Sequence, residues 1–189
     1  MMRRLFLLFA ALCLSLVSAE AQKGFAVIVD SKTYAACKAA IDAYESLLES
    51  EGFATEIMAR TWDEPDAIRE VLFDKYVNYG LEGAIFIGDI PIPMIRDAQH
   101  LTSAFKMDQE RFPFRDSSVP SDRFYDDFDL RFDYLRQDES DSLLHYYSLR
   151  ADSPQFIKSD IYTGRLKPTQ EGEEGYRQIR DYFTKLLQE

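Results

Sequence analysis

The sequence has little of the residue types that most often carry catalysis or bind metals. It contains two cysteines and two histidines in 189 residues, and His100 and His145 do not stand in the spacing of a zinc site. No serine lies in a G-x-S-x-G elbow, and no glycine-rich phosphate loop follows a predicted strand. The sequence therefore gives little support to a function as a nucleotide-binding protein or a serine hydrolase.

A long hydrophobic run is also lacking beyond the first residues. Arg3 and Arg4, an apolar stretch from residue 5 to residue 17 and Ala19-Glu20-Ala21 form the three parts of a secretory signal. The apolar stretch is shorter than the roughly 20 residues of a membrane-spanning helix. We expect residues 1–21 to be removed and the mature protein to be exported, to the periplasm, the outer surface or the medium, without a membrane anchor.

Basic residues are outnumbered, since the formal net charge is −11. This balance disfavours nucleic acids and anionic membranes as partners, and it leaves carboxylates available for a hard cation. Once Cys13 is removed with the signal, Cys37 has no partner for a disulfide. Cys37 also lies on an apolar helical stripe, so we expect a buried and unreactive thiol.

Strand and helix patterns alternate along residues 22–189. Buried strands are predicted at 25–30, 53–59, 84–88 and 160–166, and helices at about 34–52, 63–79 and 169–187. This order predicts an α/β fold, a three-layer lobe with a parallel sheet of the caspase-like or flavodoxin-like type. Within it we expect Asp63 and Thr169 to cap helices, Tyr76 and Tyr79 to be buried, and Pro91 and Pro93 to end the third strand.

An insertion of about residues 96–159 interrupts this alternation. Apolar side chains from Phe128 to Tyr134 alternate with charged ones, which predicts a strand with one solvated face. Residues 143–149 are a suitable partner strand, so we expect a β-hairpin at the carboxyl edge of the sheet. His145 would then lie on the hairpin surface, and His100 is the better functional candidate of the two histidines.

Four charged residues follow predicted strands or precede the hairpin, where open α/β sheets bind ligands: Asp30, Asp89, Asp122 and Arg165. Helix capping and loop anchoring are the alternative roles for such carboxylates. Asp126, Asp127 and Asp129 are candidate ligands of a structural Ca²⁺, although a solvated strand face explains Asp129 equally well.

Three motifs resemble, in order and spacing, the front part of the gingipain-like cysteine peptidases over about residues 25–189. They are the strand ending in Gly88-Asp89-Ile90-Pro91, the turn Pro120-Ser121-Asp122 and the strand Asp160-Ile161-Tyr162-Thr163-Gly164-Arg165-Leu166. The resemblance implies a secreted, caspase-like α/β peptidase whose catalytic histidine and cysteine follow later strands. Neither Cys37 nor His100 matches that dyad, so we expect the chain to act with the remainder of a catalytic domain.

For the ligand, the resemblance implies a protein or peptide substrate and no required cofactor, with calcium common in the family. Asp122 matches a position that helps to bind a basic substrate side chain, and Asp89 and Arg165 are further candidate substrate-binding residues. Two other hypotheses stay open. One is an exported, non-catalytic binding module that uses the aromatic hairpin, and the other is a metal-dependent hydrolase built on Asp30, Asp89 and Asp122.

Overall fold

The computed structural model describes residues 23–102 and 106–188, so the predicted signal at 1–21 lies outside the described residues. The elements in chain order are β1 (Lys23–Val29), α2 (Ser31–Ser50), β2 (Phe53–Ala59), α3 (Pro65–Tyr79), β3 (Leu81–Ile87), β4 (Ile92–Arg96), the 3₁₀ turn η1 (Gln99–Leu101), α4 (Phe114–Ser117), β5 (Val119–Pro120), α5 (Arg123–Asp126), β6 (Phe132–Gln137), β7 (Leu144–Leu149), β8 (Tyr162–Leu166) and α6 (Gly172–Leu186).

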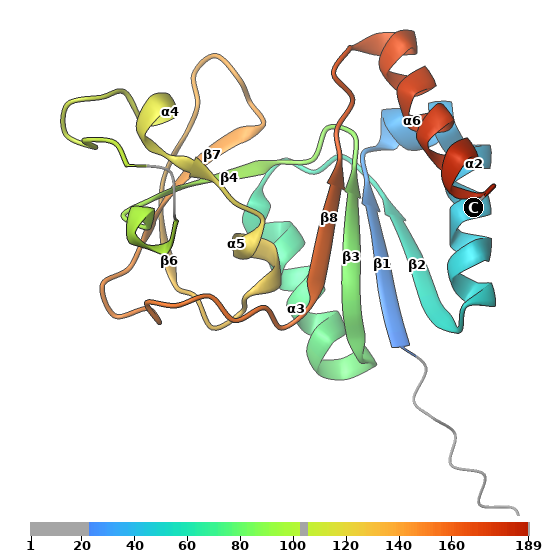
Figure 1. Cartoon of the computed structure of the whole chain (residues 1–189), viewed down its shortest axis with the longest axis horizontal. Coiled ribbons are helices and arrows are strands. Elements are labelled where there is room, and N and C mark those ends of the chain that lie inside the picture. The colour runs from blue at the N-terminus through green and yellow to red at the C-terminus, as the bar shows by residue number, and fades with distance from the viewer. Residues whose placement is uncertain (1–22, 103–105, 189) are drawn as a thin grey trace, which may run out of the picture.

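Four of these strands form sheet A, which is parallel throughout and has the order β2-β1-β3-β8. Helices α2 and α6 lie on one side of it and α3 lies on the other (Figure 1). The predicted α/β class and the three-layer arrangement of helix, parallel sheet and helix are therefore confirmed.

Side-chain alternation along β1 explains the layering. Phe25, Val27 and Val29 pack with Cys37, Ile41, Ile179 and Phe183 of α2 and α6. Ala26 and Ile28 point to the other face, where they pack with Ile68 and Leu72 of α3. A strand buried on both faces needs a continuous apolar run, which is what β1 has.

The remaining strands form sheet B, with the order β5-β4-β7-β6. Strand β4 follows β3 after a short turn and pairs in parallel with β7, and β5 and β6 are antiparallel neighbours at the two edges. The α3-side core of sheet A continues into this second sheet through Phe124, Tyr125, Tyr147 and Leu149. The two sheets therefore share one hydrophobic core.

The expectation that the prolines end the third strand and keep out of a ladder is wrong for Pro93, because this residue lies inside β4, a central strand of sheet B. The Pro93 carbonyl accepts a hydrogen bond from Ser121 N at 2.9 Å, and the Ser121 carbonyl, which a residue with an N–H group could have bonded from position 93, accepts from Phe124 N. Because β5 is only two residues long, the absence of an N–H group on Pro93 leaves no carbonyl of that strand without a donor.

The hairpin is confirmed, since β6 and β7 pair antiparallel. Its first strand begins later than the alternation predicts, at Phe132, because residues 127–130 form a loop. Arg69 of α3 donates to the carbonyls of Asp127, Phe128 and Leu130, and Phe128 N donates to Asp160 Oδ2 at 2.8 Å. Backbone groups that are bonded to side chains in this way do not join a ladder.

Three local expectations about the helices are also wrong. Helix α3 begins after Glu64 without a side-chain cap from Asp63, and Thr169 bonds to Gln178 Oε1 while α6 begins at Gly172. Tyr76 and Tyr79 are exposed, because only the narrow face of α3 that carries Ile68 and Leu72 meets the sheet.

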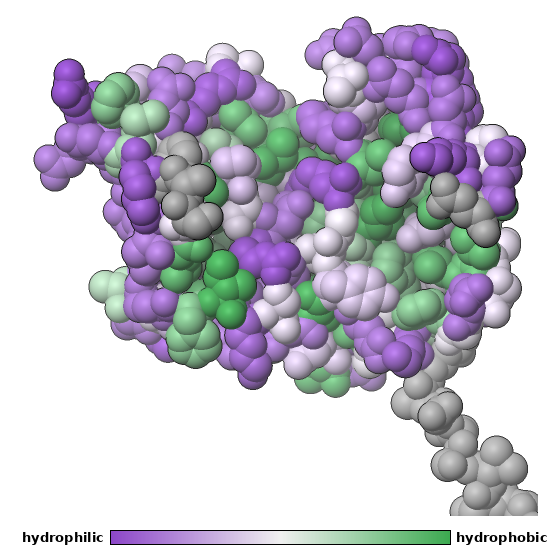
Figure 2. All heavy atoms as spheres, viewed as in Figure 1, coloured by the Kyte–Doolittle hydropathy of each residue, from purple (hydrophilic) through white to green (hydrophobic). Residues whose placement is uncertain are grey.

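The space-filling view shows hydrophilic residues over α6, and hydrophobic residues in the region where sheet A meets α2 (Figure 2). Among residues 23–102 and 106–188, none of the helices combines the length and the apolar character of a membrane span.

Candidate functional site

A cleft of about 860 Å³ lies beyond the carboxyl ends of the strands of sheet A. One wall consists of residues that follow β1, β2, β3 and β8, together with the first residues of α2 and α6; the other consists of the β6–β7 loop and Arg115 of α4. Figure 2 shows the corresponding hollow at the upper edge of the molecule, between the hairpin and the start of α6. The volume lies within the range of roughly 300–1,000 Å³ that is typical of ligand sites.

The position of this cleft follows from the strand order. From β1 the chain moves to one side to form β2 and then to the other side to form β3, so the order reverses between β1 and β3. Open α/β sheets bind ligands at the carboxyl ends of strands where this reversal occurs. Asp30 and Asp89, which follow β1 and β3, both line the cleft.

Asp30 has the capping role that the sequence left open. Its Oδ1 accepts from Lys32 N and Thr33 N at 3.0 and 2.9 Å, and its Oδ2 accepts from Asp89 N at 2.8 Å. Gly88 makes this contact possible, since its φ is +82° and a Cβ there would collide with the Asp30 carboxylate and the Thr33 hydroxyl. The cap therefore joins the start of α2 to the end of β3.

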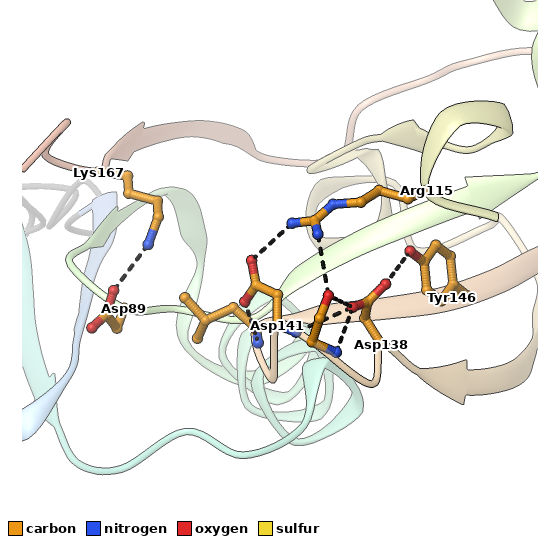
Figure 3. Close-up of polar contacts among 8 residues, drawn as sticks. Asp89, Arg115, Asp138, Asp141, Tyr146 and Lys167 are labelled. Carbon is orange, nitrogen blue, oxygen red and sulfur yellow. Dashed lines mark hydrogen bonds and ion pairs between the residues drawn. The ribbon is translucent and has the colours of Figure 1, made fainter. Parts of the chain in front are cut away.

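Each wall of the cleft carries one ion pair (Figure 3). On the sheet side, Lys167 Nζ lies 2.9 Å from Asp89 Oδ1, and on the hairpin side Arg115 lies 3.5 Å from Asp141 Oδ2. All four side chains are more than a third exposed, so each pair contributes roughly 0–1 kcal/mol and separates easily when a ligand binds.

The β6–β7 loop is held in place by Asp138. Its carboxylate accepts from Tyr146 Oη at 2.6 Å and from the backbone and hydroxyl of Ser140 at 2.9 and 2.8 Å. These bonds, the one from Tyr146 first, hold the pKa of Asp138 well below its usual range. These contacts tie the β6–β7 loop to the start of β7.

Arg165 of β8 brings the three motifs of the sequence together just below the cleft. Its guanidinium lies 2.7 Å from Asp122 Oδ1 and 3.1 Å from Asp122 Oδ2, and it donates to the carbonyls of Ile90 and Pro91 at 2.8 and 3.1 Å. Asp122 and Arg165 are thus partners of each other, while Asp89 points to Lys167. Neither Asp122 nor Arg165 lines the cleft, and the substrate-binding role of all three stays a prediction.

The three predicted calcium ligands do not converge. Asp126 is buried and pairs with Arg123 at 2.7 Å and with Thr163 Oγ1 at 2.6 Å; Asp127 accepts from Lys158 N, and Asp129 is exposed. Across residues 23–102 and 106–188, no three acidic, histidine or cysteine side chains form a group suited to a metal. Arg123 already supplies the positive charge that a cation would bring, so these contacts do not support the calcium prediction.

The candidate nucleophile and bases lie apart. Cys37 is buried in the α2–α6 core as expected, where desolvation raises the pKa of its thiol, and its Sγ contacts the Tyr176 carbonyl. His100 is exposed on η1. The expectation of a surface position for His145 is wrong, because β7 is covered on both faces and this imidazole is 2% exposed, with its pKa lowered by burial.

Sequence patterns did not indicate Arg115 or Lys167 as parts of the site, and they placed the hairpin at the carboxyl edge without giving its loop a role. Lys167 follows β8 directly, so the rule that ligands bind beyond strand ends could have found it. Arg115 lies on α4 and the loop joins two strands of sheet B, and nothing in the local sequence places Arg115 opposite β3.

Comparisons of this chain with protein-family models, with curated proteins and with solved structures found no match.

Proposed function

We propose that this protein is the substrate-binding lobe of an exported cysteine peptidase of the gingipain-like type, with a caspase-like sheet and with peptide substrates bound in the carboxyl-edge cleft. The observation that carries the proposal is the meeting of the three family-like motifs at Arg165, beside the cleft. The resemblance is stronger evidence for one family when the segments that carry it are far apart in sequence and contact each other in the fold.

In this proposal, Arg165 and Asp122 position the turn after β3 and do not contact the substrate themselves. Their bidentate pair and the bonds to Ile90 and Pro91 fix the turn after β3, and Asp89 in that turn faces the cleft. A basic substrate group would reach Asp122 only by sharing it with Arg165. Specificity for basic side chains therefore depends on the acidic residues that line the cleft: Asp30, Asp63, Asp89, Asp141 and Glu171.

The thiolate and imidazole of such a peptidase are expected in strands that follow this lobe, as the resemblance implies. Cys37 is unsuited to the task because it is desolvated and lies in the core away from both histidines. We expect the 189-residue chain to bind peptides without cleaving them, and the remainder of the catalytic domain to complete the site.

The test uses the product of the whole reading frame and fluorogenic peptide amides with arginine or leucine before the reporter. Hydrolysis that iodoacetamide abolishes and that survives Cys37→Ser is expected. Loss of hydrolysis in Cys37→Ser would overturn the assignment of the thiol to the core. Absence of both hydrolysis and peptide binding in the cleft would overturn the peptidase proposal itself.

A non-catalytic binding module is the second candidate, and one feature favours it. Tyr134 and Leu135 are 54% and 41% exposed on β6, an edge strand of sheet B. In that case peptides would bind without hydrolysis in the whole product, and Tyr134→Ser would weaken binding while Asp89→Asn would leave it unchanged. The peptidase proposal expects the opposite response from these two variants.

A further inference from the structure

Helix α3 carries apolar side chains on a face that no helix or strand within residues 23–102 and 106–188 covers. Phe73, Tyr76 and Val77 are 49%, 37% and 59% exposed, and their spacing of three and four residues places them side by side on the helix. The apolar surface of α3 therefore extends beyond its contact with sheet A, in a segment where a solvated helix usually has polar residues.

The loop after α5 extends this surface. The ring of Phe128 lies 5.4 Å from that of Phe73 and 5.3 Å from that of Tyr76, measured between centroids. Arg69 holds the loop in place through its bonds to the Phe128 carbonyl and two neighbouring carbonyls. We call Phe73, Tyr76, Val77 and Phe128 the α3 patch; none of them lines the cleft.

The charged residues around the α3 patch are acidic. Glu70 and Asp74 each lie three residues before a patch residue, and Asp129 is exposed next to Phe128. Of the two cations of the helix, Lys75 pairs with Glu56 at 2.5 Å, and Arg69 is partly buried, where it donates to the carbonyls of the Phe128 loop. The patch therefore has an apolar centre and a rim whose exposed charged residues are acidic.

We propose that the α3 patch is a docking surface for a basic amphipathic helix of a partner protein. Aromatic side chains at the centre of a surface are the usual anchors of an interface, and the acidic rim selects lysine and arginine around the partner's apolar stripe. A second copy of this chain fits poorly, because both copies would bring the same acidic rim and a net charge of −11. Anionic membranes are disfavoured for the same reason.

The experiment titrates the whole chain into a fluorescein-labelled 18-residue helical peptide with leucine on one face and lysine on the other. Micromolar binding is expected, and the double variant Phe73→Ser, Val77→Ser should weaken it by about tenfold or more. Tyr182→Ser is the matched control, because Tyr182 on α6 is 48% exposed and lies outside the α3 patch; a change below about twofold is expected there.

A second variant keeps the apolar centre and so answers the case in which the double variant fails to fold. Glu70→Lys with Asp74→Lys should weaken binding of the lysine peptide by about fivefold and favour the same peptide with glutamate in place of lysine. Equal affinity of wild type and both double variants for the lysine peptide would overturn the proposal. Two other outcomes would also overturn the proposal. Sedimentation could show a dimer that is lost in Phe73→Ser, Val77→Ser, which would make a second copy the occupant. Phosphatidylcholine vesicles could bind through the α3 patch, which would make a membrane the occupant.

Discussion

The two sheets of this protein are stabilised in different ways. Sheet A is parallel, and its strand β1 is buried on both faces between α2, α6 and α3. Sheet B also has buried apolar side chains, among them Met94, Tyr146 and Tyr147, and its region adds charged side chains that bond to the backbone or lie over rings. Arg69 donates to three carbonyls of the loop before β6, and Arg96 lies 4.0 Å from the centre of the Phe114 ring. Hydrophobic burial therefore organises both regions, and individual polar contacts contribute more in the second.

This difference bears on the candidate site, which lies where the two regions meet. Sheet A supplies a wall set by strand order, and sheet B supplies a wall set by Asp138, Arg115 and the loop they hold. Loops positioned by a regular scaffold are where binding residues concentrate. The specificity of the cleft is therefore expected to depend on loop residues of both walls, and its integrity on the strand order of sheet A.

The largest effect is expected in sheet A. Ile28→Ala removes buried methyl groups from the face of β1 that packs on α3, where Ile28 is 0% exposed. The free energy of unfolding should fall by about 4 kcal/mol in urea denaturation, because the cavity adds to the lost transfer energy. Ile157→Ala is the matched control, since Ile157 is 45% exposed and should cost under about 0.5 kcal/mol. Equal losses in the two variants would contradict the assignment of the core.

Arg69 tests whether sheet B depends on polar contacts. Arg69→Met keeps the apolar stem but leaves three partly buried carbonyls without their donor, so a loss of about 3 kcal/mol is expected in urea denaturation. Hydrogen exchange should accelerate at residues 127–130 more than in β1. Arg131→Met, which removes an exposed ion pair with Asp152 in the same region, should cost under about 0.5 kcal/mol. Uniform acceleration throughout the chain would contradict a local role.

The same contrast decides how far the sequence predicts the fold. Sheet A was predictable strand by strand, including β2 at 53–59, because buried strands and amphipathic helices differ in hydrophobic period. The hairpin pairing of sheet B was predictable as well. Strand β4 was not predictable, because the general rule against proline in central strands fails at Pro93. The neighbouring strand β5 is only two residues long and needs no hydrogen bond from position 93.

The candidate site was predictable only on its sheet A side. Asp30 and Asp89 follow predicted strands, so their meeting at one edge follows from a parallel sheet. The partnership of Asp122 with Arg165 and the burial of His145 depend on how the second sheet packs against the first. Contacts of this long range leave no local pattern, so the resemblance implied a substrate role for Asp122 without indicating its partner Arg165.

Asp122 tests the contact that joins the two regions. Asp122→Asn removes the charge of a pair that is 16% and 24% exposed, and a loss of about 2 kcal/mol is expected in urea denaturation. Asp181→Asn, which removes an ion pair with Arg177 that is more than half exposed on both sides, is the control and should cost under about 0.5 kcal/mol. Combining Asp122→Asn with Arg165→Gln should cost less than the sum of the single losses. Strict additivity would contradict the pairing.

The smallest expected effect has the opposite sign and concerns a buried carboxyl group between α5 and β8. Burial raises the pKa of Asp126 to about 6, although Thr163 and Arg123 oppose the shift, and its Oδ1 has no hydrogen-bond partner among the described residues. A raised pKa means that the folded protein holds this proton more tightly than the unfolded chain, whose carboxyl has a pKa near 3.8. The proton therefore stabilises the fold below pH 4, and that contribution is lost as the pH rises from about 4 to 6.

Asp126→Asn stays neutral throughout this window. The variant should match the wild type near pH 4 and be more stable by about 1 kcal/mol above pH 6, as measured by urea denaturation at a series of pH values. If Asp126→Asn is instead less stable at pH 7, the ion pair with Arg123 outweighs the desolvation of the carboxylate, and a buried charge stabilises this junction between the two sheets.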